Sequence, residues 1–153
     1  MLILKDQDYY NPEPVDFEAY AELIEEDFEG TITMFIEPYT NDDFPFDTEL
    51  IQLIKEVPNR VYFFEDIITY AVLKEKENLK QKMKDYITSK VSSDVIYTVR
   101  KFIENNMNSS QSAKKLYMHR NTLNYRVDNF IESVHINVKT FKGASAIYLL
   151  YEY

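Results

Sequence analysis

The stretch MHRNTLNYRV, Met118 to Val127, concentrates side chains that can hydrogen-bond to a polyanion. Asn and Arg can pair with the edges of bases, whereas Thr, Tyr and the free backbone N–H groups of a helix start can bind phosphates. Acidic side chains are absent from residues 108–127, although the whole protein has a formal net charge of −9. The polar or hydrogen-bonding residues of this stretch are His119, Arg120, Asn121, Thr122, Asn124, Tyr125 and Arg126.

A short polar segment before this stretch supplies further basic side chains, Lys114 and Lys115. Together with Arg120 and Arg126 they give residues 108–127 a formal charge of +4. A helix that is merely solvated would be expected to include carboxylates in so acidic a chain. Two simpler interpretations remain open: the helices form an ordinary helical core, and Tyr125 packs rather than binding a ligand.

The spacing of apolar residues from Asp94 onward predicts three helices that would position these side chains. The first ends around the pair Asn105 and Asn106. The second is short, with Asn108 as its N-cap and Gln111 three residues later, and it ends near Tyr117. His119 can cap the third helix, whose apolar face consists of Leu123, Val127, Phe130 and Val134.

The junction between the second and third helices has the spacing of a helix-turn-helix. Ala113 is small enough to let two helices cross closely, and Leu116 follows it by three residues. Met118 would plug the turn, and Leu123 lies five residues further on. In this motif the last helix enters the major groove of DNA.

The charge is distributed unevenly between the two halves of the chain. Residues 1–73 hold three basic and 18 acidic side chains, whereas residues 74–153 hold 14 basic and eight acidic ones. Screening limits the reach of exposed charges to about 8–10 Å at physiological salt, so a polyanion responds mainly to the local charge. The objection that so acidic a protein cannot bind DNA is therefore weakened, but it is not removed.

The front half alternates helical and extended patterns. Residues 17–28 show helical spacing, and Gly30 is placed to end this helix. TITMFIEPY and RVYFF have the composition of strands. NDDFPFD reads as a loop, and TELIQLIKEV is predicted to be a short helix that ends before a proline. The predicted fold class is α+β, with a small acidic α/β N-terminal unit followed by an all-α helix-turn-helix domain. The expected divisions are residues 1–73, a Lys-rich helical connector over 74–93, and the helix-turn-helix domain over 94–153.

Several classes of function are disfavoured by the composition. The chain has no cysteine, its two histidines do not have metal-ligand spacing, and its two glycines form no phosphate-binding loop, so we expect neither an enzyme nor a bound cofactor or metal. No apolar run approaches the roughly 20 residues of a membrane span. We therefore expect a cytoplasmic protein. The Lys-rich face of the connector is interpreted as solvated, with a phosphate-facing or a dimerisation surface as alternatives.

At HRNTLNYRV, preceded by NSSQSAKKLYM, the sequence resembles the C-terminal helix-turn-helix of PucR/CdaR-type bacterial transcriptional regulators, a motif related to that of the factor for inversion stimulation. TVRKFIENNMN, from Thr98 to Asn108, resembles the helix that precedes this motif. VYFFEDI, from Val61 to Ile67, resembles the end of a preceding degenerate cyclase-like domain. The resemblance departs from the family where a glycine is usual: here Tyr117 follows Leu116, and His135 follows the third helix.

The resemblance implies that the residues named above, from His119 to Arg126, contact double-stranded DNA and that Lys114 and Lys115 lie near phosphates. It also implies a homodimer on paired half-sites. We expect a regulator without an attached sensor domain. The alternative is a protein–protein interaction module that is derived from such a regulator, does not bind DNA alone, and meets a protein partner through the acidic N-terminal unit.

Overall fold

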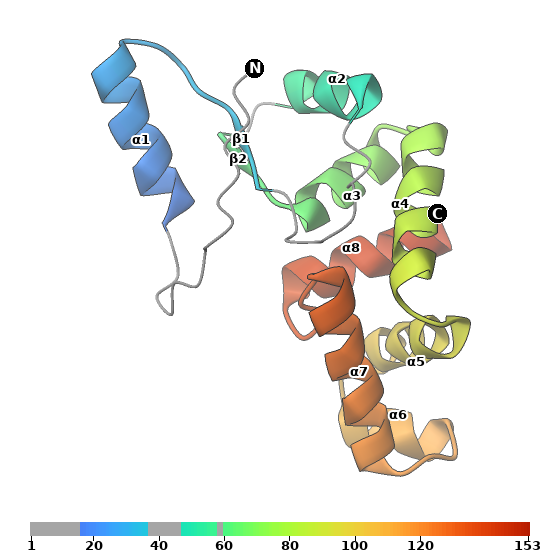
Figure 1. The fold of residues 1–153 in the computed structure, drawn as a ribbon. Helices are drawn as coiled ribbons and strands as arrows, with labels where there is room; N and C mark the ends of the chain where they lie inside the picture. Colours follow the sequence, from blue (N-terminus) through green and yellow to red (C-terminus); the bar gives the residue numbers. More distant parts are fainter. Residues whose placement is uncertain (1–15, 37–46, 58–59) are drawn as a thin grey trace.

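The structure is a computed structural model that describes residues 16–36, 47–57 and 60–153. These parts are mostly helical, and two short strands pair in parallel, Met34 with Val61 and Phe35 with Tyr62 (Figure 1). The elements are α1 Phe17–Phe28, β1 Met34–Phe35, α2 Thr48–Glu56, β2 Val61–Tyr62, α3 Phe64–Leu73, α4 Glu77–Lys90, α5 Ser93–Glu104, α6 Ser109–Lys115, α7 Arg120–Val134 and α8 Phe141–Glu152.

The predicted order of elements in the front half is present wherever the structure describes it. Asp16 caps α1 by accepting a hydrogen bond from the backbone N–H of Ala19. One detail was wrong: Glu29, not Gly30, adopts the left-handed conformation that ends α1, with φ of 50°. The predicted loop NDDFPFD lies outside the described residues except for Asp47, and the acidic α/β unit as a whole stays a prediction.

Lysines of α4 and of the turn before it contact the acidic residues of α2. Lys82 donates hydrogen bonds to Asp47, which caps α2, and to Glu49 at 3.3 Å. The hydrogen bond from Lys82 lowers the pKa of Asp47 below its ordinary value. Lys76 forms an ion pair with Glu56 at 3.0 Å. These lysines are therefore occupied within the chain, which reduces the positive charge that this segment presents to an external polyanion.

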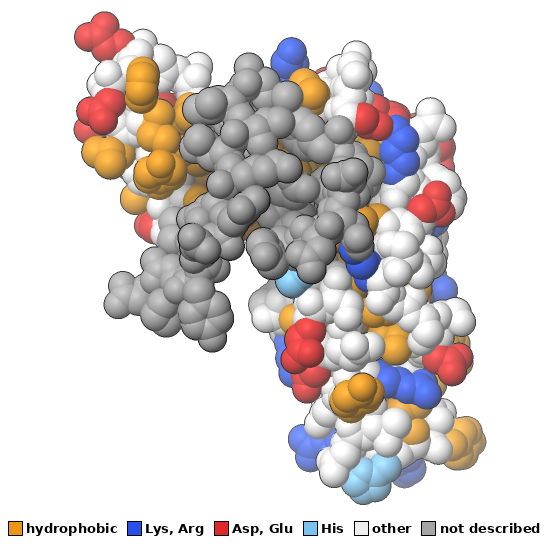
Figure 2. All heavy atoms as spheres, viewed as in Figure 1, with side chains coloured by type: hydrophobic (Ala, Val, Ile, Leu, Met, Phe, Trp, Pro, Cys, Tyr) orange, Lys and Arg blue, Asp and Glu red, His pale blue; other side chains and the backbone are white. Residues whose placement is uncertain are grey.

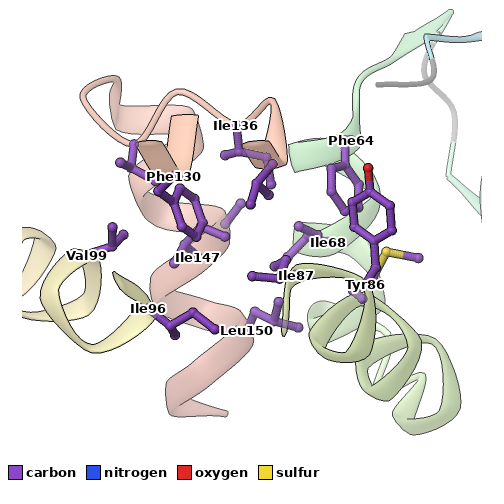
Figure 3. Close-up of a cluster of buried hydrophobic side chains, with 14 of the residues drawn as sticks. Phe64, Ile68, Tyr86, Ile87, Ile96, Val99, Phe130, Ile136, Ile147 and Leu150 are labelled. Atoms are coloured by element: carbon purple, nitrogen blue, oxygen red, sulfur yellow. The ribbon is translucent and has the colours of Figure 1, made fainter. Parts of the chain in front are cut away.

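A single cluster of buried side chains joins α3 and α4 to the C-terminal helices. Figure 3 shows Ile68 of α3 and Ile87 of α4 pointing toward the side chains of α8, among them Ile147 and Leu150. Burial of such aliphatic side chains contributes roughly 1.5–3 kcal/mol each. The core thus continues across the expected divisions after residues 73 and 93, and the division into three units stays a prediction.

The turn between α7 and α8 brings α8 close to the preceding backbone. His135 ends α7 with φ of 59°, in the left-handed region, at the position where the family that the sequence resembles commonly has a glycine. Ile136 and Val138 are buried, and Thr140 caps α8. A Cβ atom added to Gly143 would lie 2.7 Å from the carbonyl carbon of Asn137, so glycine is required for this close approach.

Candidate nucleic-acid interface

The predicted second helix and its turn are present as α6 and residues 116–119. Asn108 caps α6 by accepting a hydrogen bond from the backbone N–H of Gln111 at 3.0 Å. Ser112 and Ala113 are buried where α6 packs against the neighbouring helices α5 and α7. Small side chains at these positions let the helices approach closely, as the sequence predicted for Ala113.

The turn between α6 and α7 has an unusual backbone conformation. Tyr117 has φ of 51°, and its side chain is 98% exposed. The backbone N–H of Met118 donates to the carbonyl of Ala113 at 3.0 Å, which closes the end of α6. The Met118 side chain is half-buried against the core rather than fully buried, so the expected plug is partial.

α7 is fixed by its cap and by its apolar face. The Nδ1 atom of His119 accepts a hydrogen bond from the backbone N–H of Asn121 at 3.2 Å, as expected for an N-cap. The predicted inward residues, Leu123, Val127, Phe130 and Val134, are all buried. α7 packs most closely against α5 and α6. This packing turns the opposite face of α7, together with its N-terminal end, toward solvent.

Most of the predicted contact residues are exposed on this side. Tyr125 is 72% exposed, and Asn124 is half-buried. Lys114 and Arg120 form no ion pair with another described residue. The remaining exposed members of the predicted set are Lys115, His119, Asn121 and Thr122.

Besides His119, two of the predicted contact residues have side-chain partners within the chain. Arg126 donates a hydrogen bond from Nη1 to the hydroxyl of the buried Thr98 at 3.0 Å. Lys115 donates from Nζ to the side-chain oxygen of Asn105, which is also buried. These bonds tie α7 and α6 to α5. Thr98 and Asn105 were missed from the sequence, where the only signal was a polar residue beside the apolar face of α5.

The acidic residues closest in sequence lie further along α7. Asp128 follows Arg120 by eight residues, about 12 Å along the helix, and pairs with Lys139 at 2.6 Å. Figure 1 places α6 and the start of α7 at one end of the molecule and α1 and α2 at the other. Figure 2 shows Lys, Arg and His but no acidic side chain on the visible face of that end.

These features define a helix-turn-helix domain, and the comparisons with known proteins agree. Residues 95–152 match the PucR C-terminal helix-turn-helix domain. The proline-responsive transcriptional activator PutR of Bacillus subtilis (strain 168) is 31% identical over 58 residues, which cover 38% of this chain and 14% of PutR. Residues 95–152 therefore form a PucR-type C-terminal helix-turn-helix domain, which confirms the resemblance seen in the sequence.

Two further similarities extend beyond this domain. The uncharacterized protein YxkF of B. subtilis (strain 168) is 38% identical over 93 residues, covering 57% of this chain and 30% of YxkF. A regulator of polyketide synthase expression from Bifidobacterium adolescentis matches in fold, with a TM-score of 0.51 and 18% identity over 67% of this chain and 44% of that one. The chain thus spans less than a third of either B. subtilis relative.

By their names, PutR is a transcriptional activator and the Bifidobacterium protein is a regulator of polyketide synthase expression. A helix-turn-helix domain of this type is not normally an enzymatic one. None of the helices in the described ranges is both long and apolar enough to cross a membrane.

Proposed function

We propose that this protein binds double-stranded DNA as a bacterial-type transcriptional regulator, with the N-terminal half of α7 in the major groove. The observation that supports this most strongly is the position of the acid-free window at one end of the molecule, opposite α1 and α2. The acidic elements α1 and α2 do not lie beside His119–Arg126, although Asp128, which pairs with Lys139, and Glu132 follow on the solvent-facing side of α7. The separation leaves the local charge of the interface positive.

Different residues would make the contacts with base edges and the contacts with phosphates. Arg120 and Asn121 stand in the first turn of α7 and can reach base edges, and Asn124 lies one turn after Arg120. Lys114 and the free backbone N–H groups at the start of α7 can bind phosphates. Lys115 adds positive charge close to the same phosphates while it holds α6 against α5. The action is binding and not catalysis.

Two copies on paired half-sites would double this small interface. A single helix-turn-helix unit offers few base contacts, and regulators of this kind gain affinity and specificity by dimerisation. We propose a homodimer for this reason.

Binding to a pool of random duplex DNA, measured by fluorescence anisotropy at about 50 and 200 mM salt, tests the proposal. Phosphate contacts predict an affinity that falls steeply between these concentrations. On a site selected from the pool, Arg120→Ala should cost about 1–3 kcal/mol, the range of a base-edge contact. Lys55→Ala is the matched control, because Lys55 is exposed on α2 at the far end of the molecule. Equal losses for both variants would remove Arg120 from the interface.

α1 favours a second candidate function, a module that binds a protein partner. Its exposed apolar side chains, Tyr20, Leu23 and Phe28, are interspersed with carboxylates, and only Arg60 pairs with two of these in the described residues. Such a face suits a partner that is basic and apolar. Absence of DNA binding at 50 mM salt would leave this function as the better account.

A further inference from the structure

The centre of the solvent-facing side of α7 carries no basic residue. Tyr125 lies two residues after Leu123 and two before Val127, both buried, so its side chain points about 160–200° away from them. Asn121 and Thr122 lie one turn earlier on the same side, and both are exposed. The line that would face the base edges most directly therefore consists of an amide, a hydroxyl and an aromatic ring.

The two arginines of α7 lie away from this line. Arg120 is five residues before Tyr125, about 140° around the helix, so it lies near the opposite side of α7 and is exposed at the N-terminal end of the helix. Arg126 is directed to Thr98 on α5. Asp128 and Glu132 follow on the solvent-facing side, so that the uncharged line ends after Tyr125. DNA contact is thereby confined to the first two turns of α7.

These side chains match one class of base pair in the major groove. Guanine is read mainly by Arg or Lys, whereas an Asn amide pairs with N6 and N7 of adenine, and apolar surface contacts the 5-methyl group of thymine. Four residues of helix rise by about 6 Å, close to two base-pair steps. Asn121 and Tyr125 can therefore reach bases within about two pairs of each other.

We propose that α7 reads A·T pairs at the centre of each half-site, with Asn121 on an adenine and the ring of Tyr125 against a thymine methyl group. Arg120 then contacts the flank of the half-site. The proposal rests on the proposed DNA-binding function and adds the class of base that the same surface recognises.

Base analogues test each contact on a site selected from random duplex DNA. Replacing the contacted thymine by uracil removes only the methyl group and should weaken binding about 4-fold, the value of one buried methyl or methylene. Replacing the contacted adenine by 7-deazaadenine removes N7 and should weaken binding as well. Uracil should have no effect on Tyr125→Ala, and 7-deazaadenine no effect on Asn121→Ala, whereas Tyr125→Phe should respond to uracil like the parent protein.

The outcomes separate this proposal from the one on which it rests. Tight DNA binding with G·C pairs at the half-site centre, or with no thymine sensitive to uracil, overturns A·T reading and leaves DNA binding intact. Failure to bind any duplex at 50 mM salt overturns both. Because Tyr125 and Asn121 are exposed, their variants should retain the parent circular dichroism spectrum and melting temperature.

Discussion

His119 has two tasks that can be separated by substitution, capping α7 and contacting DNA. Its Nδ1 atom accepts the backbone N–H of Asn121, and a nitrogen that accepts carries no proton. The neutral imidazole then carries its proton on Nε2, which is left as a donor for a phosphate oxygen. His119→Asn keeps a good N-cap but removes the Nε2 donor, whereas His119→Ala removes both.

The expected magnitudes follow from these two hydrogen bonds. Loss of the cap in His119→Ala should lower the free energy of unfolding by about 1 kcal/mol, or roughly 2–4 °C in melting temperature for a chain of this size. His119→Asn should melt close to the parent protein. Both variants should bind DNA at least about 10-fold more weakly, because a hydrogen bond to a charged phosphate oxygen contributes about 1.5–3 kcal/mol. The salt dependence should be unchanged, because a neutral donor releases no counterion.

Thermal unfolding and anisotropy titrations on the parent protein, His119→Ala and His119→Asn distinguish capping of α7 from contact with DNA. If His119→Asn binds DNA as tightly as the parent, His119 only caps the helix and makes no DNA contact. If His119→Asn melts as low as His119→Ala, the hydrogen bond to Asn121 does not stabilise α7. A shallower salt dependence in both variants would mean that His119 binds DNA as a cation, against the reasoning from Nδ1.

Four further substitutions test positions in and around the interface. Tyr117→Gly should raise the melting temperature by about 2 °C, because glycine relieves the left-handed backbone while the exposed ring packs on nothing; a lower value would contradict this. Gly143→Ala should cost about 1–3 kcal/mol in a denaturant titration, since the added Cβ meets the backbone of Asn137. Arg126→Met should lower the stability of the protein through the lost hydrogen bond to Thr98 but leave the salt dependence of DNA binding unchanged. Lys114→Met, in contrast, should reduce the slope of log K for DNA binding against log salt concentration by about 1.

The helix-turn-helix was predictable from the sequence because its signals are local. The cap residues Asn108 and His119 and the buried face that includes Leu123 and Val127 follow from spacing within one or two helical turns. The left-handed conformation of His135 was not predicted, although the residue stands where the family that the sequence resembles commonly has a glycine. Local sequence rules were sufficient to predict those features that depend only on a helix and its cap.

Contacts between distant residues were not predictable from one sequence. The sequence groups Arg126 with the other polar residues of α7, but its partner Thr98 is 28 positions earlier. The pairing of Lys82 with Asp47 likewise spans 35 positions. A periodic pattern shows which face of a helix is apolar, but it does not show which long side chain on its border turns inward.

The acidity of the whole chain is compatible with DNA binding because charge is separated along the molecule. α7 has 15 residues and is about 22 Å long, more than twice the screening length of about 8–10 Å at physiological salt. Its N-terminal end carries the basic window, and α1 and α2 lie at the opposite end of the fold. Part of the acidic charge there is also paired, with Lys76, Lys82 and Arg60 as the partners. The net charge of −9 therefore governs the solubility of the protein and its behaviour at low salt, whereas the local +4 governs what α6 and α7 can bind.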